Sequence, residues 1–260
     1  MPLHLVPLAL AGAGVALAKS LSSRGDQPEE PTVSNGNLDR LILDRFSGDG
    51  PCPWLNLAQD ESFDGAILKA SEGVGYAPSW FVEQWEAAHT AGVRFLGSYH
   101  FLRFDQTGAS QAQTYLAQLR KVGFGSGNHF NPVVDFEQGG PTHANRSVGK
   151  SQALTALNSF MATVEQATGR PVILYGGSAL RDWGITKADI PRFWKLWTAR
   201  YSATLPATTY TSMGMSVSDL FAWQYCGDSE SYLPGYPKTV DGFGKCDISA
   251  MQMSLTEACQ

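Results

Sequence analysis

Two acidic residues close a short apolar run in the middle of the chain. The run spans residues 132–137 and reads PVVDFE. It predicts a β-strand, and because residues i and i+2 of a strand point to the same face, Asp135 and Glu137 should lie side by side at its end. Neighbouring carboxylates repel, so one can keep its proton near neutral pH while the other is ionised. Cleavage of a glycosidic bond uses such a pair; the alternative is two unrelated, solvated acids at a strand end.

The composition is that of a globular protein. Of its residues, 43% are hydrophobic and 17% are charged. The length of 260 residues is enough for one barrel-sized domain or two smaller ones. The formal net charge of −5 argues against a nucleic-acid partner, which requires a basic surface. The sequence contains neither a His/Cys cluster with zinc spacing nor a phosphate-binding glycine loop, so we expect no metal and no cofactor.

The N-terminal segment differs from the rest of the chain. Residues 2–18 carry no Asp, Glu, Lys or Arg and are rich in Ala, Leu and Gly. This run is slightly short for a spanning helix of ~20 residues. Ala16-Leu17-Ala18 resembles a small-x-small cleavage site, although no basic residue precedes the run. We interpret residues 1–18 as an export signal, a weak membrane anchor or an arm that contacts a larger assembly, with an ordinary buried helix as the remaining alternative.

Three regions follow from this reading. Residues 19–38, rich in Ser, Gly, Pro, Glu and Asn, predict a flexible linker, and residues 39–260 the catalytic domain. We expect an exported protein that acts outside the cell or in the cell envelope, with a virion-associated protein as the alternative.

Short apolar runs alternate with helical stretches beyond the linker. Strands are predicted at 41–44, 65–70, 95–101, 132–136, 172–175, 196–201, 221–225 and 245–248, and helices at 79–91, 110–121 and 150–168. Such alternation indicates a parallel sheet covered by helices. Eight strands favour a closed, TIM-like β/α barrel that is irregular and has few helices in its last third. An open doubly wound sheet would normally carry a nucleotide-binding loop.

Polar residues gather at the C-terminal ends of these strands, where β/α barrels place their active sites. They are Asp44, Lys69, Tyr99, Asp135, Glu137, Tyr175, Tyr201 and Gln224. Lys69 is unusual inside an apolar strand, because a buried lysine needs a partner. Pairing with an active-site acid is one solution, and an exposed strand end is the other.

Four cysteines make a disulfide plausible in an exported protein. They are Cys52, Cys226, Cys246 and Cys259. Cys226 follows one predicted strand and Cys246 lies in the next, so we expect them to form a bridge. The alternative is four free thiols in a reducing compartment.

Several pieces, in order, resemble glycoside hydrolase family 25, the lysozyme-like N-acetylmuramidases. The segment LKASEG at 68–73 is similar to the family's Lys-Ala-Thr-Glu-Gly, GSYHF at 97–101 to its Gly-Ala-Tyr-His-Phe, and VVDFE at 133–137 to its acid-bearing strand. Residues 197–201, 223–225 and 246–249 match its closing segments. The similarity runs from about Leu41 to Met251.

The resemblance implies hydrolysis of the β-1,4 bond from N-acetylmuramic acid to N-acetylglucosamine, so the expected partner is a peptidoglycan glycan strand. It implies Glu137 as the general acid. Asp135 would orient the substrate's 2-acetamido group as this group attacks the anomeric carbon, with net retention. Asp44 and Asp247 match the family's other active-site acids, and Tyr99 matches a tyrosine that faces the reacting sugar.

The remaining candidates would bind substrate: Tyr175, Tyr201, Trp223, Gln224 and Lys69. Trp223 has an alternative place in the barrel core. Two other functions stay open, a non-catalytic glycan-binding or structural barrel and a chitinase-like hydrolase. Chitinases also use Asp-x-Glu, but they usually carry a longer acidic run before the Glu.

The chain departs from the family pattern at its first strand. Where the family continues Asp-Val-Ser, this chain has Asp44-Arg45-Phe46-Ser47. Arg45, next to the acid, is expected to narrow the cleft or to bind a substrate carboxylate.

Overall fold

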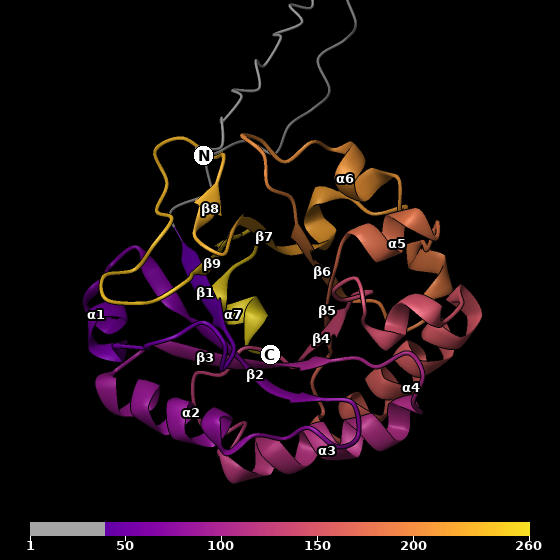
Figure 1. The fold of residues 1–260 in the computed structure, drawn as a ribbon, viewed down its shortest axis with the longest axis horizontal. Helices are drawn as coiled ribbons and strands as arrows, with labels where there is room; N and C mark the ends of the chain where they lie inside the picture. The colour runs from indigo at the N-terminus through magenta and orange to yellow at the C-terminus, as the bar shows by residue number, and fades with distance from the viewer. Residues whose placement is uncertain (1–39) are drawn as a thin grey trace, which may run out of the picture. The chain divides into compact units, whose positions relative to one another are not determined.

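The computed structural model describes residues 40–260 and shows a closed barrel (Figure 1). The predicted N-terminal segment 1–18 and linker 19–38 lie outside the described residues. The barrel strands are β1 (Leu41–Arg45), β2 (Phe63–Glu72), β3 (Phe95–Phe101), β4 (Val133–Phe136), β5 (Ile173–Gly176), β6 (Lys195–Ala199), β7 (Leu220–Gly227) and β9 (Asp247–Met251). Each of β1 to β6 pairs in parallel with the next strand, up to β7, and β9 joins β7 to β1. The expected eight-stranded, TIM-like barrel is confirmed.

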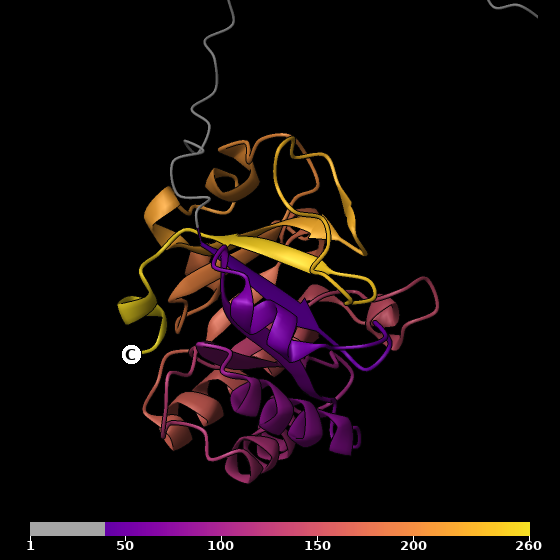
Figure 2. The ribbon, with the colours of Figure 1, turned by 90° about the vertical axis from the view of Figure 1, so that its left-hand side faces the viewer.

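The helices cover mainly the first half of the barrel (Figures 1 and 2). They are α1 (Trp54–Gln59), α2 (Ser79–Ala91), α3 (Gly108–Lys121) and α4 (Lys150–Thr168). Later connections contain only α5 (Ser178–Asp182), α6 (Thr208–Thr211) and the short 3-10 turns Lys187–Asp189 and Val217–Asp219, and α7 (Leu255–Ala258) ends the chain. The irregular last third is therefore as expected. Within residues 40–260, no helix is long and apolar enough to cross a membrane.

The last barrel strand runs against the expected direction. A uniformly parallel sheet is predicted, but β9 is antiparallel to both β7 and β1. Parallel neighbours need a long crossover connection, usually a helix. Between β7 and β9 the chain has only the short strand β8 (Glu230–Ser231), which forms a hairpin with β7. The chain therefore returns beside β7 in the opposite direction.

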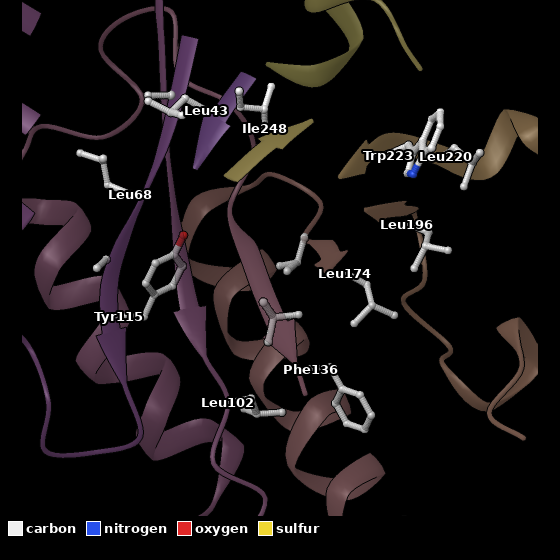
Figure 3. Packing of buried hydrophobic residues seen from close by; sticks show 14 of the residues in the cluster. Leu43, Leu68, Leu102, Tyr115, Phe136, Leu174, Leu196, Leu220, Trp223 and Ile248 are labelled. Atoms are coloured by element: carbon white, nitrogen blue, oxygen red, sulfur yellow. The ribbon is translucent and has the colours of Figure 1, made fainter. Parts of the chain in front are cut away.

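Strand alternation divides the core into two layers. Residues such as Leu43, Leu68 and Leu174 point outward and pack against the helices (Figure 3). Ile42 and Ile67 belong to a second cluster that fills the barrel. Each strand therefore fixes which of its residues can face the barrel axis.

The predicted Cys226–Cys246 disulfide is wrong. All four cysteines are free thiols. Cys226 pairs across the sheet with Ile248, two residues beyond Cys246, so the two thiols are not opposite each other. The thiol of Cys226 donates to the carbonyls of Lys238 (3.6 Å) and Cys246 (3.7 Å).

Gly108 allows α3 and α4 to approach closely. A Cβ atom at this position would lie 1.9 Å from the carbonyl oxygen of Ala156 and 2.6 Å from the amide nitrogen of Phe160. We expect Gly108→Ala to lower the free energy of unfolding by about 1–3 kcal/mol, because the helix backbones must separate. Gly75→Ala, where no atom lies within 4 Å of the added Cβ, is the matched control. Equal unfolding curves in urea for both variants would contradict this account of the packing.

Candidate active site

A cleft of about 290 Å³ opens at the C-terminal ends of the parallel strands and the N-terminal end of the antiparallel β9. It is lined by Asp44, Phe46, Lys69, Tyr99, Phe101, Asp135, Glu137, Tyr175, Trp197, Tyr201, Gln224 and Asp247. These include every predicted site residue except Trp223. A larger hollow of about 590 Å³ lies around the end of α2 and the start of β3, and Glu86 is the one acid in its lining. The chemistry expected from the sequence therefore belongs to the smaller cleft.

Strand periodicity explains how these side chains meet. On several strands, an inward apolar residue that fills the barrel is followed two positions later by a polar residue at its mouth. Ile42 precedes Asp44 in this way, Val133 precedes Asp135, and Ile173 precedes Tyr175. The floor of the cleft is thus the upper layer of the barrel core.

Asp44 and Asp247 form a directly opposed pair across β1 and β9. The pKa of Asp44 is raised well above its usual range, first by burial and then by the nearby charge of Asp247. Burial also raises the pKa of Asp247, while a hydrogen bond of 2.6 Å from the backbone N–H of Asp228 acts in the opposite direction. Burial and the charge of Asp247 thus both favour the protonated form of Asp44.

Asp135 and Glu137 differ in depth. Asp135 is buried and its Oδ1 has no hydrogen-bond partner among residues 40–260, whereas Glu137 is partly exposed just beyond β4. Burial raises the pKa of both carboxyls, and the negative charge of Glu137 raises that of Asp135 further. Lys69 opposes this rise at both residues. Asp135 therefore lies deeper in the cleft than Glu137.

Lys69 fits neither alternative raised by the sequence: its side chain is only 15% exposed, and its partner is not one of the predicted active-site acids. It lines the cleft, and its Nζ pairs with the carboxylate of Glu72 at 2.7 Å. Its partner is thus an acid outside the predicted catalytic set. The ammonium group also lies 4.8 Å from the centre of the Phe101 ring, a favourable cation–π distance.

Gln224 connects two tyrosines to Asp44. Its Oε1 accepts hydrogen bonds from the hydroxyls of Tyr175 and Tyr201, both at 2.9 Å. Its Nε2 donates to Oδ2 of Asp44, also at 2.9 Å. Because both hydroxyls meet the amide oxygen, the amide nitrogen is left facing the carboxylate. The two tyrosines therefore orient the Gln224 amide so that its nitrogen, and not its oxygen, faces Asp44.

Two expectations about neighbouring residues are corrected. Trp223 lies on the outer face of β7, where its indole N–H donates to the carbonyl of Arg200 at 2.7 Å (Figure 3). Arg45 is 1% exposed and does not line the cleft, because its guanidinium donates to carbonyls of the loop that follows β1. Arg45 directly follows the cleft-lining Asp44, and Trp223 directly precedes the cleft-lining Gln224. Because consecutive strand residues face opposite sides of a sheet, neither side chain can face the cleft.

Sequence reasoning missed four residues. Phe46, Phe101 and Trp197 line the cleft. The signal for the first two was available, since each lies two positions after a predicted site residue, Asp44 or Tyr99. Asn145 is fully buried and donates to the carbonyls of Leu102 and Glu137, both at 2.8 Å, which holds the chain around Glu137. Nothing in the local sequence marks Asn145. Among the described residues, no cluster of His, Cys, Asp and Glu is arranged to hold a metal ion.

Comparisons with known proteins agree with one another. The family model described as Glycosyl hydrolases family 25 matches residues 43–235. Lysozyme M1 of Streptomyces globisporus is 25% identical over 218 residues, which cover 75% of this chain and 72% of that protein. A family 25 glycosyl hydrolase from Bacillus anthracis superposes with a TM-score of 0.65 at 20% identity, over 90% of this chain and 97% of that one.

A second similar structure carries a ligand. The modular autolysin LytC from Streptococcus pneumoniae, solved in complex with a synthetic peptidoglycan ligand, has a TM-score of 0.58 at 17% identity. The match covers 80% of this chain and 46% of LytC. At such identities the structural likeness shows the shared fold.

The contribution of Lys69 to the acids can be measured directly. Lys69→Met removes the cation that stabilises the charged forms of Asp135 and Glu137, so both pKa values should rise. Carboxyl carbon-13 NMR titration checks this. Lys187→Met, which breaks a 2.7 Å surface pair with Asp219, is the control and should leave both cleft acids unchanged. Unshifted titrations of Asp135 and Glu137 in Lys69→Met would disprove the electrostatic link.

Proposed function

Since the chain belongs to glycosyl hydrolase family 25, we propose that it is a muramidase that cleaves peptidoglycan between N-acetylmuramic acid and N-acetylglucosamine. The observation that carries the proposal is the set of four acids around one cleft: Asp44, Asp135, Glu137 and Asp247. The similarity to Lysozyme M1 and the fold shared with a peptidoglycan-bound autolysin support it.

Glu137 acts as the general acid in this proposal. Burial and the nearby charge of Asp247 raise its pKa, which favours the protonated form that a general acid needs, and its partly exposed position lets it reach the glycosidic oxygen. As the bond from the anomeric carbon to that oxygen breaks, the proton moves to the leaving sugar. Glu137 then takes a proton from the water that completes hydrolysis.

Asp135 supports the substrate's own nucleophile. The carbonyl oxygen of the 2-acetamido group attacks the anomeric carbon and forms an oxazoline-like ring, while Asp135 accepts the acetamido N–H. Water reopens the ring from the opposite face, and two displacements give net retention. The unpartnered Oδ1 of Asp135 is consistent with this role, because it has a free acceptor site. Acetamido assistance is an established exception to attack by an enzyme nucleophile.

The other cleft residues shape the charge around the reacting sugar. Asp44 and Asp247 sit opposite each other and provide hydrogen bonds to substrate hydroxyls, and the hydroxyl of Tyr99 faces the reaction centre. Tyr175, Tyr201 and Gln224 line the remaining wall. The complete acid set favours an enzyme over a non-catalytic barrel, and the family match favours a muramidase over a chitinase-like hydrolase.

The proposed function also suggests how the chain is divided into regions. We infer that residues 39–260 form the catalytic unit, because every site residue lies within them. Residues 2–18 would deliver this unit to a membrane or an assembly, at the cell envelope or on a virion.

The general acid can be removed without changing the shape of its side chain. Glu137→Gln should fold normally and lose about 10²–10⁴-fold in kcat on cell-wall fragments, because the amide cannot donate the proton. Glu83→Gln, an exposed change on α2, is the control and should retain full activity. Turnover equal to the wild type in a purified, folded Glu137→Gln variant would reject Glu137 as the acid.

Because Tyr175 and Tyr201 both bind the amide of Gln224, substituting both should change kcat/KM by more than the product of the two single effects. Tyr175→Phe and Tyr201→Phe each leave one hydroxyl on Gln224, so the amide keeps its orientation. The double variant removes both donors, and the amide can then turn its oxygen toward Asp44. We expect kcat/KM of the double variant to fall about fivefold beyond the product of the single effects.

A second pair serves as the control for this cycle. The hydroxyl of Tyr225 donates to the carbonyl of Pro237, outside the cleft. Tyr201→Phe combined with Tyr225→Phe should therefore be additive. Additivity in both pairs would show that the tyrosines do not act through Gln224.

A further inference from the structure

We propose that Phe46 is a stacking platform for a pyranose ring of the glycan strand, and so a residue that determines substrate binding in this chain. The inference rests on the proposed function, because it assigns a sugar-binding role to one wall of the same cleft. It concerns the position at which the first strand departs from the family pattern.

The ring of Phe46 is both exposed and part of the cleft. It is 41% exposed, although it lines the same space as Asp44 and Asp247. Most other aromatic residues of the lining are buried or half-buried; Tyr201, at 48%, is the other exposed one. An exposed aromatic ring beside a polar cleft offers a flat apolar face to a ligand, and the apolar C–H face of a sugar ring fits such a surface.

The turn that carries Phe46 is closed by two reciprocal hydrogen bonds. The N–H of Phe46 donates to Oδ2 of Asp49 at 2.7 Å, and the N–H of Asp49 donates to the carbonyl of Phe46 at 3.2 Å. The ring lies over Gly48, where an added Cβ would be 2.4 Å from Cε2 and 2.6 Å from Cζ of Phe46. Glycine at position 48 therefore leaves room for this ring position.

Arg45 supports the turn from the other side. Its guanidinium Nη2 donates to the carbonyls of Asp49 (3.1 Å), Gly50 (3.3 Å) and Pro51 (3.1 Å). Its side chain is buried, and its charge lies 3.9 Å from the carboxylate of Asp49. Arg45 and Phe46, the two departures from the family pattern, thus act together. Arg45 stabilises the turn, and the turn positions the ring of Phe46. Such an ordered ring loses little conformational entropy when it binds a ligand.

The platform should act on binding more than on the chemical step, because Phe46 carries no group that can transfer a proton. We expect Phe46→Ala to raise KM for soluble wall glycan fragments about three- to tenfold, with kcat little changed. Phe46→Tyr keeps the ring and should bind as the wild type does. Phe46→Leu keeps apolar bulk but loses the flat face, so its KM should rise as in Phe46→Ala.

Two further variants separate stacking from general damage. Gly48→Ala displaces the ring and should raise KM when Phe46 is present, yet add nothing in the Phe46→Ala background. Tyr232→Ala removes an aromatic side chain that is 68% exposed and does not line the cleft, and should leave KM unchanged.

The outcomes distinguish this inference from the proposed function. If the wild type does not cleave wall glycans, the muramidase proposal fails. If the wild type cleaves them and Phe46→Ala or Phe46→Leu binds them equally well, the platform is rejected and Phe46 is only a wall of the cleft.

Discussion

The structure depends on one electrostatic constraint: several carboxyl groups are taken out of water at the same end of the barrel. Burial is the largest cause of the raised pKa at Asp44, Asp135, Glu137 and Asp247. Desolvation disfavours the charged form of an acid, and negative neighbours disfavour it further. Burial therefore shifts Glu137 toward the protonated form that the proposed reaction needs.

The fold makes this arrangement possible by separating packing from chemistry along each strand. Inward residues low in the barrel are apolar and form its core, and the inward residues above them are polar. The outward residues pack beneath α2, α3 and α4. The polar groups are then fixed by partners from other elements, as Tyr175 and Tyr201 fix Gln224 and as Asn145 holds the chain at Glu137.

Local patterns were enough to predict much of the fold. The bounds of α2, α4 and β3 agree with the predicted ranges, because helical spacing ends at Gly92 and Gly169 and the strand is a compact apolar run. The direction of β9 was not predictable in this way, since a strand's sequence carries no information on which way it enters the sheet. The same holds for the cysteines, whose register depends on the β7–β9 pairing.

In the candidate site, too, local patterns predict some features and others depend on contacts between elements. Alternation requires that only one of Trp223 and Gln224 face the cleft, but it does not say which. The orientation of the Gln224 amide depends on one hydroxyl from β5 and one from the loop after β6. The support that Arg45 gives to the turn beneath Phe46 depends on carbonyls of the following loop. These contacts arise only when the barrel closes.

The central claim is that Glu137 supplies a proton while the substrate's acetamido group, supported by Asp135, attacks the anomeric carbon. The most direct test is proton NMR of the first product formed from a soluble wall glycan, recorded before the reducing end mutarotates. Two successive displacements predict that the new reducing end appears first as the β-anomer. Initial release of the α-anomer would mean a single displacement by water and would contradict the assisted mechanism.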